Sequence, residues 1–324
     1  MDKFIFVFSG YNYGWYKDMD SPKAEGIVEF LPSHKVTTGL VATKIKSILI
    51  SNKLNSIIPI GRLYYNLDNY RYEQRNVYHL IIATPCISKM TISYLRKFKT
   101  KHSNVKLYAF LTDSMHASSP HMDYVRNKLS ADIWECVLTY DKYDADEFGF
   151  TWFGYTYYST FDELPTDSDL SEIYYVGYNK GNKEDILCDI YNYLINNGVN
   201  CRFDVISSTP SRNPGLVYLK KPISYNEVVR KTKGSKCLLE VLQAGQKVQS
   251  LRYLEAVVYN KKILSNNINI TELPYYDSRY MRYFDKIEDI DLDWIKEDCQ
   301  INYGYKGDFS PLLLVDFIKR MEHI

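Results

Sequence analysis

Polar side chains gather in a stretch that otherwise reads as buried strand and helix, from Leu238 to Asn267. After the apolar run CLLEVL, the segment QAGQKVQ carries three glutamines, and the helix predicted next has Arg252 and Glu255 three residues apart. A guanidinium suits a phosphate, a carboxylate accepts from a pair of hydroxyls, and amides donate and accept. Candidates for binding a hydroxylated, phosphorylated ligand are therefore Gln243, Gln246, Gln249, Arg252 and Glu255. Alternatively, Arg252 and Glu255 pair only with each other on the surface, for about 0.2–0.5 kcal/mol.

A second candidate is the loop GYNKGNK, which follows a predicted strand and precedes a predicted helix. Gly177 and Gly181 free the backbone for a tight turn, and Lys180 and Lys183 lie beside the helix start. Unpaired N–H groups at a helix N-terminus favour an anion, and this arrangement suits a diphosphate. The alternative is an ordinary turn with solvated lysines.

Candidates for proton transfer lie in the first half of the chain. His116 and His121 follow Asp113, which ends the apolar run VKLYAFLTD. Asp113 or His116 is the best-placed general base there, and an ordinary surface loop is the alternative.

Metal and cofactor sites find little support in the sequence. The segment after the first strand lacks the G-x-G-x-x-G of dinucleotide sites, and the P-loop pattern is absent. The 6 cysteines include no C-x-x-C pair. Asp-x-Asp triplets such as Asp144-Asp146 occur as often as chance allows in a chain this acidic. We expect no metal and no cofactor.

Strand and helix alternate in the first half of the chain. Strands are predicted at 4–8, 77–84, 105–113 and 132–140, and helices at 38–54, 88–103 and 121–131. Short links between them indicate a parallel sheet with right-handed crossovers, whose chemistry lies beyond the carboxyl ends of its strands. The pattern breaks at 148–172, which we predict to be a surface link.

A second alternation starts directly after this link. Strands are predicted at 173–176, 201–207, 237–242 and 262–266. The first helix ends at Asn197-Gly198, and its apolar face holds Ile186, Leu187, Ile190, Tyr191, Leu194 and Ile195. Ser224 and Glu227 form a capping box at the start of the next helix.

The pattern therefore predicts an α/β protein of two Rossmann-like domains facing across a cleft. We place the first domain at 1–165 and the second at 172–308. The last predicted helix lies in 309–324, where it can pack back on the first domain. Domain interfaces are a preferred place for a small ligand.

Composition excludes several classes of function. The 324 residues are 45% hydrophobic, typical of a globular protein, and 40 basic residues balance 39 acidic ones. That balance predicts no nucleic-acid partner. No apolar run approaches the roughly 20 residues that span a bilayer, and no secretory leader precedes the first strand. We expect a cytoplasmic protein, including the inner face of the cell membrane, where peripheral contact is compatible with the sequence.

The segments YVGYNKGNKEDILCDIYNYL and SYNEVVRKTKGSKCLLEVLQAGQKVQSLRYLEAVVYNKKILSNN resemble the second domain of GT-B-type bacterial glycosyltransferases from lipopolysaccharide, capsule and exopolysaccharide clusters. TYDKYDADEFGF is similar to the segment before their interdomain link. The resemblance covers most of the chain from about Val77 and is strongest at 173–267.

The resemblance implies roles for the residues of both loops. It places Gly177, Lys180 and Gly181 by a diphosphate, with the donor site lined by Gln246, Ser250, Arg252 and Glu255. Two residues depart from the family. Asn182 stands where an arginine is common, and Val248 where a glycine is frequent, which implies a donor pocket of altered shape or affinity.

The resemblance also implies the reaction: transfer of a sugar from a nucleotide-sugar donor to a glycan or lipid-linked acceptor, in surface polysaccharide biosynthesis. Lys180, Arg252 and the helix start would stabilise the leaving diphosphate. Inversion at the sugar needs a base such as Asp113 or His116, and retention does not. The alternatives are a non-catalytic sugar-nucleotide-binding protein and an epimerase on the same scaffold.

Overall fold

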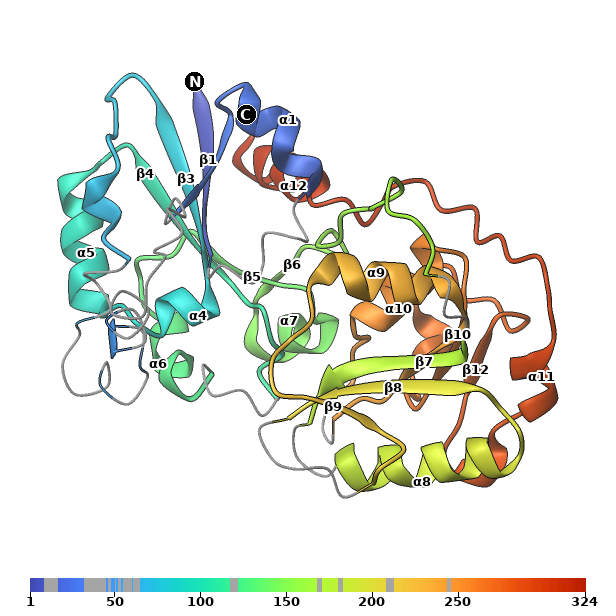
Figure 1. The fold of residues 1–324 in the computed structure, drawn as a ribbon. Coiled ribbons are helices and arrows are strands. Elements are labelled where there is room, and N and C mark those ends of the chain that lie inside the picture. Colours follow the sequence, from blue (N-terminus) through green and yellow to red (C-terminus); the bar gives the residue numbers. More distant parts are fainter. Residues whose placement is uncertain are drawn as a thin grey trace. The chain divides into compact units, whose positions relative to one another are not determined.

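Two compact units make up the chain in the computed structural model, which describes residues 1–8, 17–31, 45, 48–49, 51, 54, 60, 65–116, 122–167, 171–179, 183–207, 213–243 and 246–324. The first unit comprises Met1–Ser159 and Phe309–Ile324, and the second comprises Thr160–Asp308. Each unit is built around one parallel sheet (Figure 1). The predicted α/β class with two Rossmann-like domains is confirmed, while a cleft between them stays a prediction.

The sheet of the first unit has the strand order β2-β1-β3-β4-β5-β6, and every neighbouring pair is parallel. The strands are β1 Asp2–Val7, β2 Val28–Leu31, β3 Val77–Ala83, β4 Val105–Phe110, β5 Cys136–Thr139 and β6 Thr151–Trp152. The central strands are apolar on both faces because helices cover both sides of a parallel sheet. The helices are α1 Asp20–Ala24, α4 Thr84–Ile87, α5 Ile92–Lys101, α6 Arg126–Leu129, α7 Lys142–Phe148 and α12 Leu312–Glu322, with short 3-10 turns η3 Leu67–Asn69 and η4 Met122–Tyr124.

The sheet of the second unit has the order β12-β11-β10-β7-β8-β9 and is also entirely parallel. In chain order this is the 3-2-1-4-5-6 arrangement of dinucleotide-binding folds, read from the other edge. The strands are β7 Ser171–Tyr178, β8 Cys201–Ile206, β9 Val217–Leu219, β10 Ser235–Glu240, β11 Lys262–Ser265 and β12 Met281–Tyr283. The helices are α8 Lys183–Asn196, α9 Tyr225–Gly234, α10 Leu251–Val258 and α11 Leu292–Lys296, with 3-10 turns η5 Ile270–Glu272 and η6 Ile287–Asp289.

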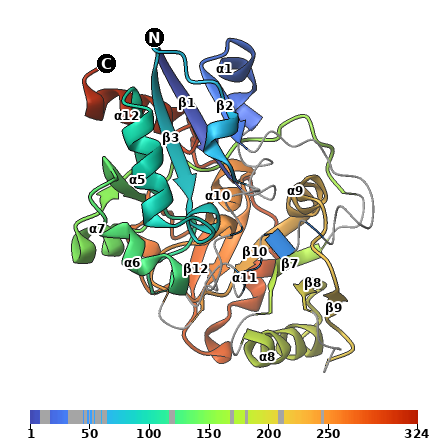
Figure 2. The same ribbon diagram turned by 90° about the vertical axis from the view of Figure 1, so that its left-hand side faces the viewer.

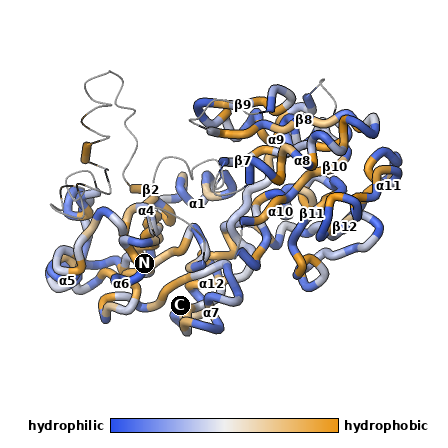
Figure 3. The backbone as a smooth tube through the Cα atoms, turned by 90° about the horizontal axis from the view of Figure 1, so that it is seen from below, coloured by the Kyte–Doolittle hydropathy of each residue, from blue (hydrophilic) through white to orange (hydrophobic). Residues whose placement is uncertain are grey.

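Helices lie on both faces of each sheet. In the first unit α5 and α12 lie on opposite sides of the sheet in two perpendicular views (Figures 1 and 2). In the second unit α8 lies on one face, and α9 and α10 lie on the other (Figure 1). Hydrophilic and hydrophobic stretches alternate along the helical tubes, as expected for helices with one face on a sheet (Figure 3).

Local signals place several helix ends where the sequence predicts them. Ser224 N-caps α9 by accepting a hydrogen bond from the amide of Glu227. Gly198 ends the turn after α8 with φ of 70°, in the left-handed region. The apolar face of α8 is narrower than predicted, because Ile186 and Ile195 are 40% and 43% exposed. The buried residues of this helix are Leu187, Ile190 and Leu194.

The predicted surface link at 148–172 is wrong in its first part. Two of its residues form β6, and Phe153 is buried, with its ring stacked 5.2 Å from that of Phe110. Tyr158 is fully buried, and its amide donates to the carbonyl of Phe309, so the two chain segments of the first unit join there. Phe153, Tyr157, Tyr158 and Phe161 are buried, which the irregular sequence pattern of this segment concealed. The predicted helix at 38–54 falls mostly outside the described residues.

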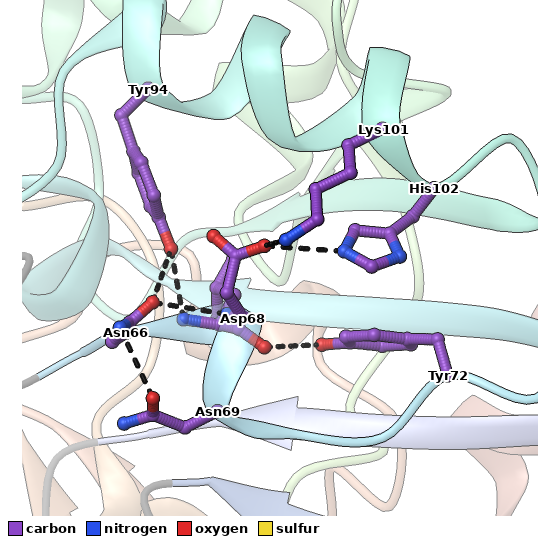
Figure 4. Close-up of polar contacts among 8 residues, drawn as sticks. Asn66, Asp68, Asn69, Tyr72, Tyr94, Lys101 and His102 are labelled. Carbon is purple, nitrogen blue, oxygen red and sulfur yellow. Dashed lines mark hydrogen bonds and ion pairs between the residues drawn. The ribbon is translucent and has the colours of Figure 1, made fainter.

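A cluster of polar residues fixes η3 against the end of α5 (Figure 4). Asp68 accepts hydrogen bonds from Lys101, at 2.6 Å, and from the imidazole of His102, at 3.2 Å. Burial acts to raise the pKa of Asp68, but the bonds and charges of Lys101 and His102 outweigh it and hold the pKa below its usual value. The hydroxyl of Tyr94, in the first turn of α5, donates to the side chain of Asn66. These bonds position the segment that leads into β3.

A chain of buried polar groups fastens α12 to the sheet of the first unit. The imidazole of His79 is fully buried, 3.1 Å from Asp2 and 3.0 Å from the hydroxyl of Tyr108. Tyr108 donates to Glu322 near the end of α12, and Lys106 forms an ion pair with the same carboxylate. Groups from β1, β3, β4 and α12 therefore depend on one tyrosine hydroxyl.

We predict that Tyr108→Phe lowers the free energy of unfolding by about 1–3 kcal/mol, because it leaves a ring nitrogen of His79 without its partner inside the protein. The measurement is the shift of the urea unfolding midpoint. Tyr283→Phe is the control, since Tyr283 is 39% exposed, and we expect a change within about 0.5 kcal/mol. Equal midpoints for both variants would contradict this account of α12.

Candidate functional site

The two predicted ligand loops follow neighbouring strands of the second unit. β7 and β10 pair in parallel, and they are the strands at which the order of the sheet reverses. Ligands of open α/β sheets bind beyond the carboxyl ends of strands at such a switch point. Gly177 lies near the end of β7, and the loop with Gln246 and Ser250 follows β10. Three residues of the first loop, Lys180, Gly181 and Asn182, lie outside the described residues.

Gly177 has a steric reason to be glycine. A Cβ at this position would lie 2.5 Å from the hydroxyl of Tyr175, which precedes it on the same face of β7. The Tyr175 side chain is 3% exposed, and burial raises the pKa of its hydroxyl to about 12. The backbone of Gly177 therefore lies, without a side chain, next to the buried and un-ionised hydroxyl of Tyr175.

A hydrogen-bonded group missed by the sequence analysis closes the start of α8. Asn179 donates from its side chain to Glu184, at 2.7 Å, and the other oxygen of Glu184 accepts from Tyr218 at the same distance. The side-chain oxygen of Asn179 is buried, and no described residue donates to it. An asparagine directly after a strand end and an acid in the first helical turn were the available signals, and β9, which carries Tyr218, was not predicted.

Glu240 is the second residue that the sequence analysis did not place in the site. It ends β10 with no exposed surface, and its two oxygens accept from the amide of Ser250 and the hydroxyl of Ser265, each at 2.6 Å. The amide of Asn267 donates in turn to Ser265. Burial raises the pKa of Glu240 above its usual value, against these serine bonds and the charge of Lys183. One acid in the apolar run CLLEVL was the signal.

Gln246 and Ser250 shape the loop between β10 and α10. The Ser250 hydroxyl is the N-cap of α10, where it accepts from the amide of Arg252. The side-chain amide of Gln246 donates to the carbonyl of Val248, at 3.1 Å, so it bridges its own loop. Both residues are half-buried. These hydrogen bonds within the loop keep the side chain of Gln246 in one position.

Arg252 and Glu255 pair with each other, but in the interior and not on the surface. Arg252 is 8% exposed and Glu255 is fully buried, with nitrogen–oxygen distances of 2.5 and 2.8 Å between them. The hydroxyl of Tyr225 on α9 also donates to Glu255, at 2.8 Å. Burial raises the pKa of Glu255, while Arg252 and Tyr225 oppose that rise. The pair joins α10 to α9 and neutralises the guanidinium charge.

In the first unit the predicted bases follow β4. Asp113 is half-buried in that loop, and His116 is exposed, with one ring nitrogen 2.9 Å from the carboxylate of Glu147 on α7. His121 lies outside the described residues. A carboxylate that orients an imidazole suits a general base, so both predicted residues stay candidates.

A buried acid holds this loop in the first unit. Asp144 on α7 is fully buried and accepts from the amide of Met115, at 2.7 Å, and from the hydroxyl of Ser114, at 3.3 Å. Burial raises its pKa to about 6, and the charge of Asp141 adds to that rise. In the sequence, Asp144 stands out only as part of an Asp-x-Asp triplet. Among the described residues, no group of three or more His, Cys, Asp or Glu side chains could hold a metal ion.

A hollow of about 320 Å³ lies at the opposite edge of the second sheet, where β7, β10 and β11 begin. Lys233 on its wall donates to three backbone carbonyls, and Lys262 donates to two. The hydrogen bonds of these lysines stabilise the fold. Sheets of this kind bind ligands beyond the carboxyl ends of their strands, whereas this hollow lies at the amino ends. The candidate site therefore stays at the carboxyl edge.

Comparison with known proteins supports the fold. No family model matches the sequence, and no curated protein matches it. Among solved structures, "lipopolysaccharide outer core galactosyltransferase WaaB apo form" aligns over 100% of this chain and 99% of its own, with 13% identity and a TM-score of 0.50. The fold is that of GT-B glycosyltransferases.

Two further structures of this fold have the same TM-score. "OtsA apo structure" aligns over 99% of both chains, with 10% identity and a TM-score of 0.50. A trehalose-6-phosphate synthase, described in a study of glycosyl transfer with retention, aligns over 99% of both chains, with 9% identity and a TM-score of 0.50. The predicted resemblance to GT-B glycosyltransferases is confirmed at the level of the fold.

The close approach of the Tyr175 hydroxyl to Gly177, near the end of β7, can be tested by substitution. We predict that Gly177→Ala lowers the free energy of unfolding by about 1–3 kcal/mol, because the new methyl group has no room beside the hydroxyl. In a Tyr175→Phe background the same change should cost less, because the closest atom is gone. Urea unfolding of the four proteins of this double-mutant cycle measures the difference. Additive effects would show that the methyl group finds room elsewhere.

The raised pKa of Asp144 predicts a pH-dependent stability. Because its pKa is higher in the folded protein than in the unfolded chain, Asp144 contributes most below about pH 4, and that contribution is lost as pH rises through about 6. Asp144→Asn cannot ionise. Its stability relative to the parent should therefore rise by about 1–3 kcal/mol between pH 4 and 7. The measurement is urea unfolding across this range.

Asp123→Asn is the control for this comparison, since Asp123 is an exposed acid of the same unit. The same pH-dependent difference in both variants would contradict the assignment to Asp144.

Proposed function

We propose that the protein is a glycosyltransferase that moves a sugar from a nucleotide-sugar donor to a glycan or lipid-linked acceptor. The observation that carries this proposal is the switch point of the second sheet, where two polar loops end β7 and β10 on a fold shared with sugar transferases. Similarity to the lipopolysaccharide galactosyltransferase WaaB supports surface polysaccharide biosynthesis as the pathway. A cytoplasmic location is part of the proposal. No helix within the described residues is long and apolar enough to cross a membrane.

The donor is proposed to lie along both loops of the second unit. Its diphosphate lies by Gly177 and the start of α8, where Lys183 and backbone N–H groups favour negative charge. Lys180, Gly181 and Asn182 belong to the same loop by resemblance. The nucleoside and sugar hydroxyls meet Gln246 and the segment before Ser250, whose amides and hydroxyls suit uncharged polar ligands.

Arg252 and Glu255 act differently in this proposal from what the resemblance implied. Because they neutralise each other, Arg252 brings little net charge to a phosphate, and the pair instead fixes α10 beneath the loop. Stabilisation of the leaving diphosphate then falls to the start of α8 and its lysines. Arg252→Ala alone would strand the buried carboxylate of Glu255, so that variant tests folding and not the donor site.

Gln246→Ala tests the donor site without disturbing a buried charge. We predict a roughly 3- to 10-fold weaker affinity for the donor, the size of one lost neutral hydrogen bond. The measurement is calorimetric titration with UDP-, GDP-, dTDP- and CMP-sugars. Gln300→Ala is the matched control, because Gln300 is exposed in the same unit, and it should bind as the parent does. Equal affinities for the two variants would remove Gln246 from the site.

Turnover decides between the proposed activity and its alternatives. Release of nucleoside diphosphate that depends on an added glycan or lipid-linked acceptor supports the transferase. Binding without turnover favours a sugar-nucleotide-binding protein, and conversion of the bound sugar without an acceptor favours an epimerase. A parent protein that neither binds nor hydrolyses any nucleotide sugar would refute the proposal.

A further inference from the structure

Glu240 joins three elements at the switch point of the second sheet. It ends β10, binds the hydroxyl of Ser265 at the end of β11, and binds the amide of Ser250 at the start of α10. The loop with Gln246 therefore has its far end tied to this carboxylate. A buried acceptor of two hydrogen bonds fixes backbone geometry more firmly than exposed contacts do.

The carboxylate of Glu240 faces mainly uncharged groups. Its two hydrogen-bond donors are an amide and a hydroxyl, and among the described residues the positive charge of Lys183, the first residue of α8, acts on it. On α10, Arg252 and Glu255 are paired with each other, and on β11 Lys262 lies at the other end of the strand, bound to carbonyls. The ammonium of Lys183 therefore acts both on Glu240 and on an anion bound at the start of α8.

A diphosphate at the start of α8 would draw on the same lysine. When two negative charges lie near one ammonium, it stabilises each of them less than it would stabilise one alone. A buried carboxylate without a counter-charge favours its protonated form. Protonation leaves one oxygen of Glu240 as an acceptor and makes the other a donor, while the Ser265 hydroxyl can reverse its bond. The loop stays tied in both states.

We propose that Glu240 is a positioning residue for the nucleotide-sugar donor: it ties the 246–250 segment to the strand ends, and it takes up one proton from solvent when a diphosphate binds beside Lys183. The inference rests on the proposed function. Because proton uptake accompanies binding, the donor binds more tightly as pH falls from 8 to 6. No bond to the donor is made by Glu240 itself.

The test for proton uptake is calorimetric titration with UDP-, GDP- and dTDP-sugars, whose diphosphate carries no group that titrates near pH 7, in buffers of different ionisation enthalpy at pH 7. We expect uptake of roughly 0.3–1 proton per nucleotide bound by the parent, and none by Glu240→Gln. Asp204→Asn is the matched control. Asp204 is an equally buried acid of the same unit, and its carboxylate accepts from Tyr174, Arg202 and Lys231, so uptake should persist. Equal uptake by the parent and Glu240→Gln overturns the proton linkage.

Hydrogen exchange tests the positioning role without any ligand. In Glu240→Ala the amide of Ser250 loses its acceptor, so peptides covering 246–250 should exchange about ten-fold faster, while peptides from α8 keep the rate of the parent. Unchanged exchange at 246–250 overturns the positioning role. This result does not depend on the proposed function, whereas failure of every nucleotide to bind the parent refutes that function and the proton linkage with it.

Discussion

A carboxylate buried in a protein must find hydrogen-bond donors, and the second unit depends on how three of its acids meet that need. Glu240 accepts hydrogen bonds from an amide and a hydroxyl, and Glu255 accepts them from a guanidinium and a phenol hydroxyl. Asp204 forms an ion pair with Lys231. Each acid draws at least one donor from a helix or strand other than its own. The positions of α9 and α10 over the sheet are therefore fixed by polar groups as well as by apolar packing.

The sequence predicted the parallel sheets, because apolar runs of strand length separated by amphipathic helices have few other solutions. It also located both loops of the candidate site, since they are where apolar runs end and polar residues begin. Local caps such as Ser224 were equally visible. These features depend on residues close together in the chain, and their spacing carries the information.

Partners that are distant in the chain were not predictable in the same way. Glu240 and Ser265 are 25 residues apart, and only the pairing of β10 with β11 brings them together. Arg252 and Glu255 read as a surface pair because three-residue spacing says nothing about which face of a helix is covered. The aromatic segment after Phe148 read as a link because its residues fill a core at irregular intervals. In each case the tertiary fold decides burial, and burial decides the role.

The acids around the start of α8 raise a question about charge in the proposed site. Glu184 and Glu240 lie close to where a diphosphate would bind, and like charges repel it. However, Glu184 accepts hydrogen bonds from the uncharged groups of Asn179 and Tyr218, and Glu240 accepts them from two serines. Each oxygen of these carboxylates accepts a hydrogen bond from the protein, which lowers its tendency to bind a ligand's hydroxyls. In the empty site the ammonium of Lys183 faces these carboxylates, and in the filled site it also faces the phosphate. Only a negatively charged ligand changes this arrangement of charges. A neutral sugar or a nucleoside without phosphate has no such effect, so this arrangement favours a nucleotide sugar over its uncharged parts.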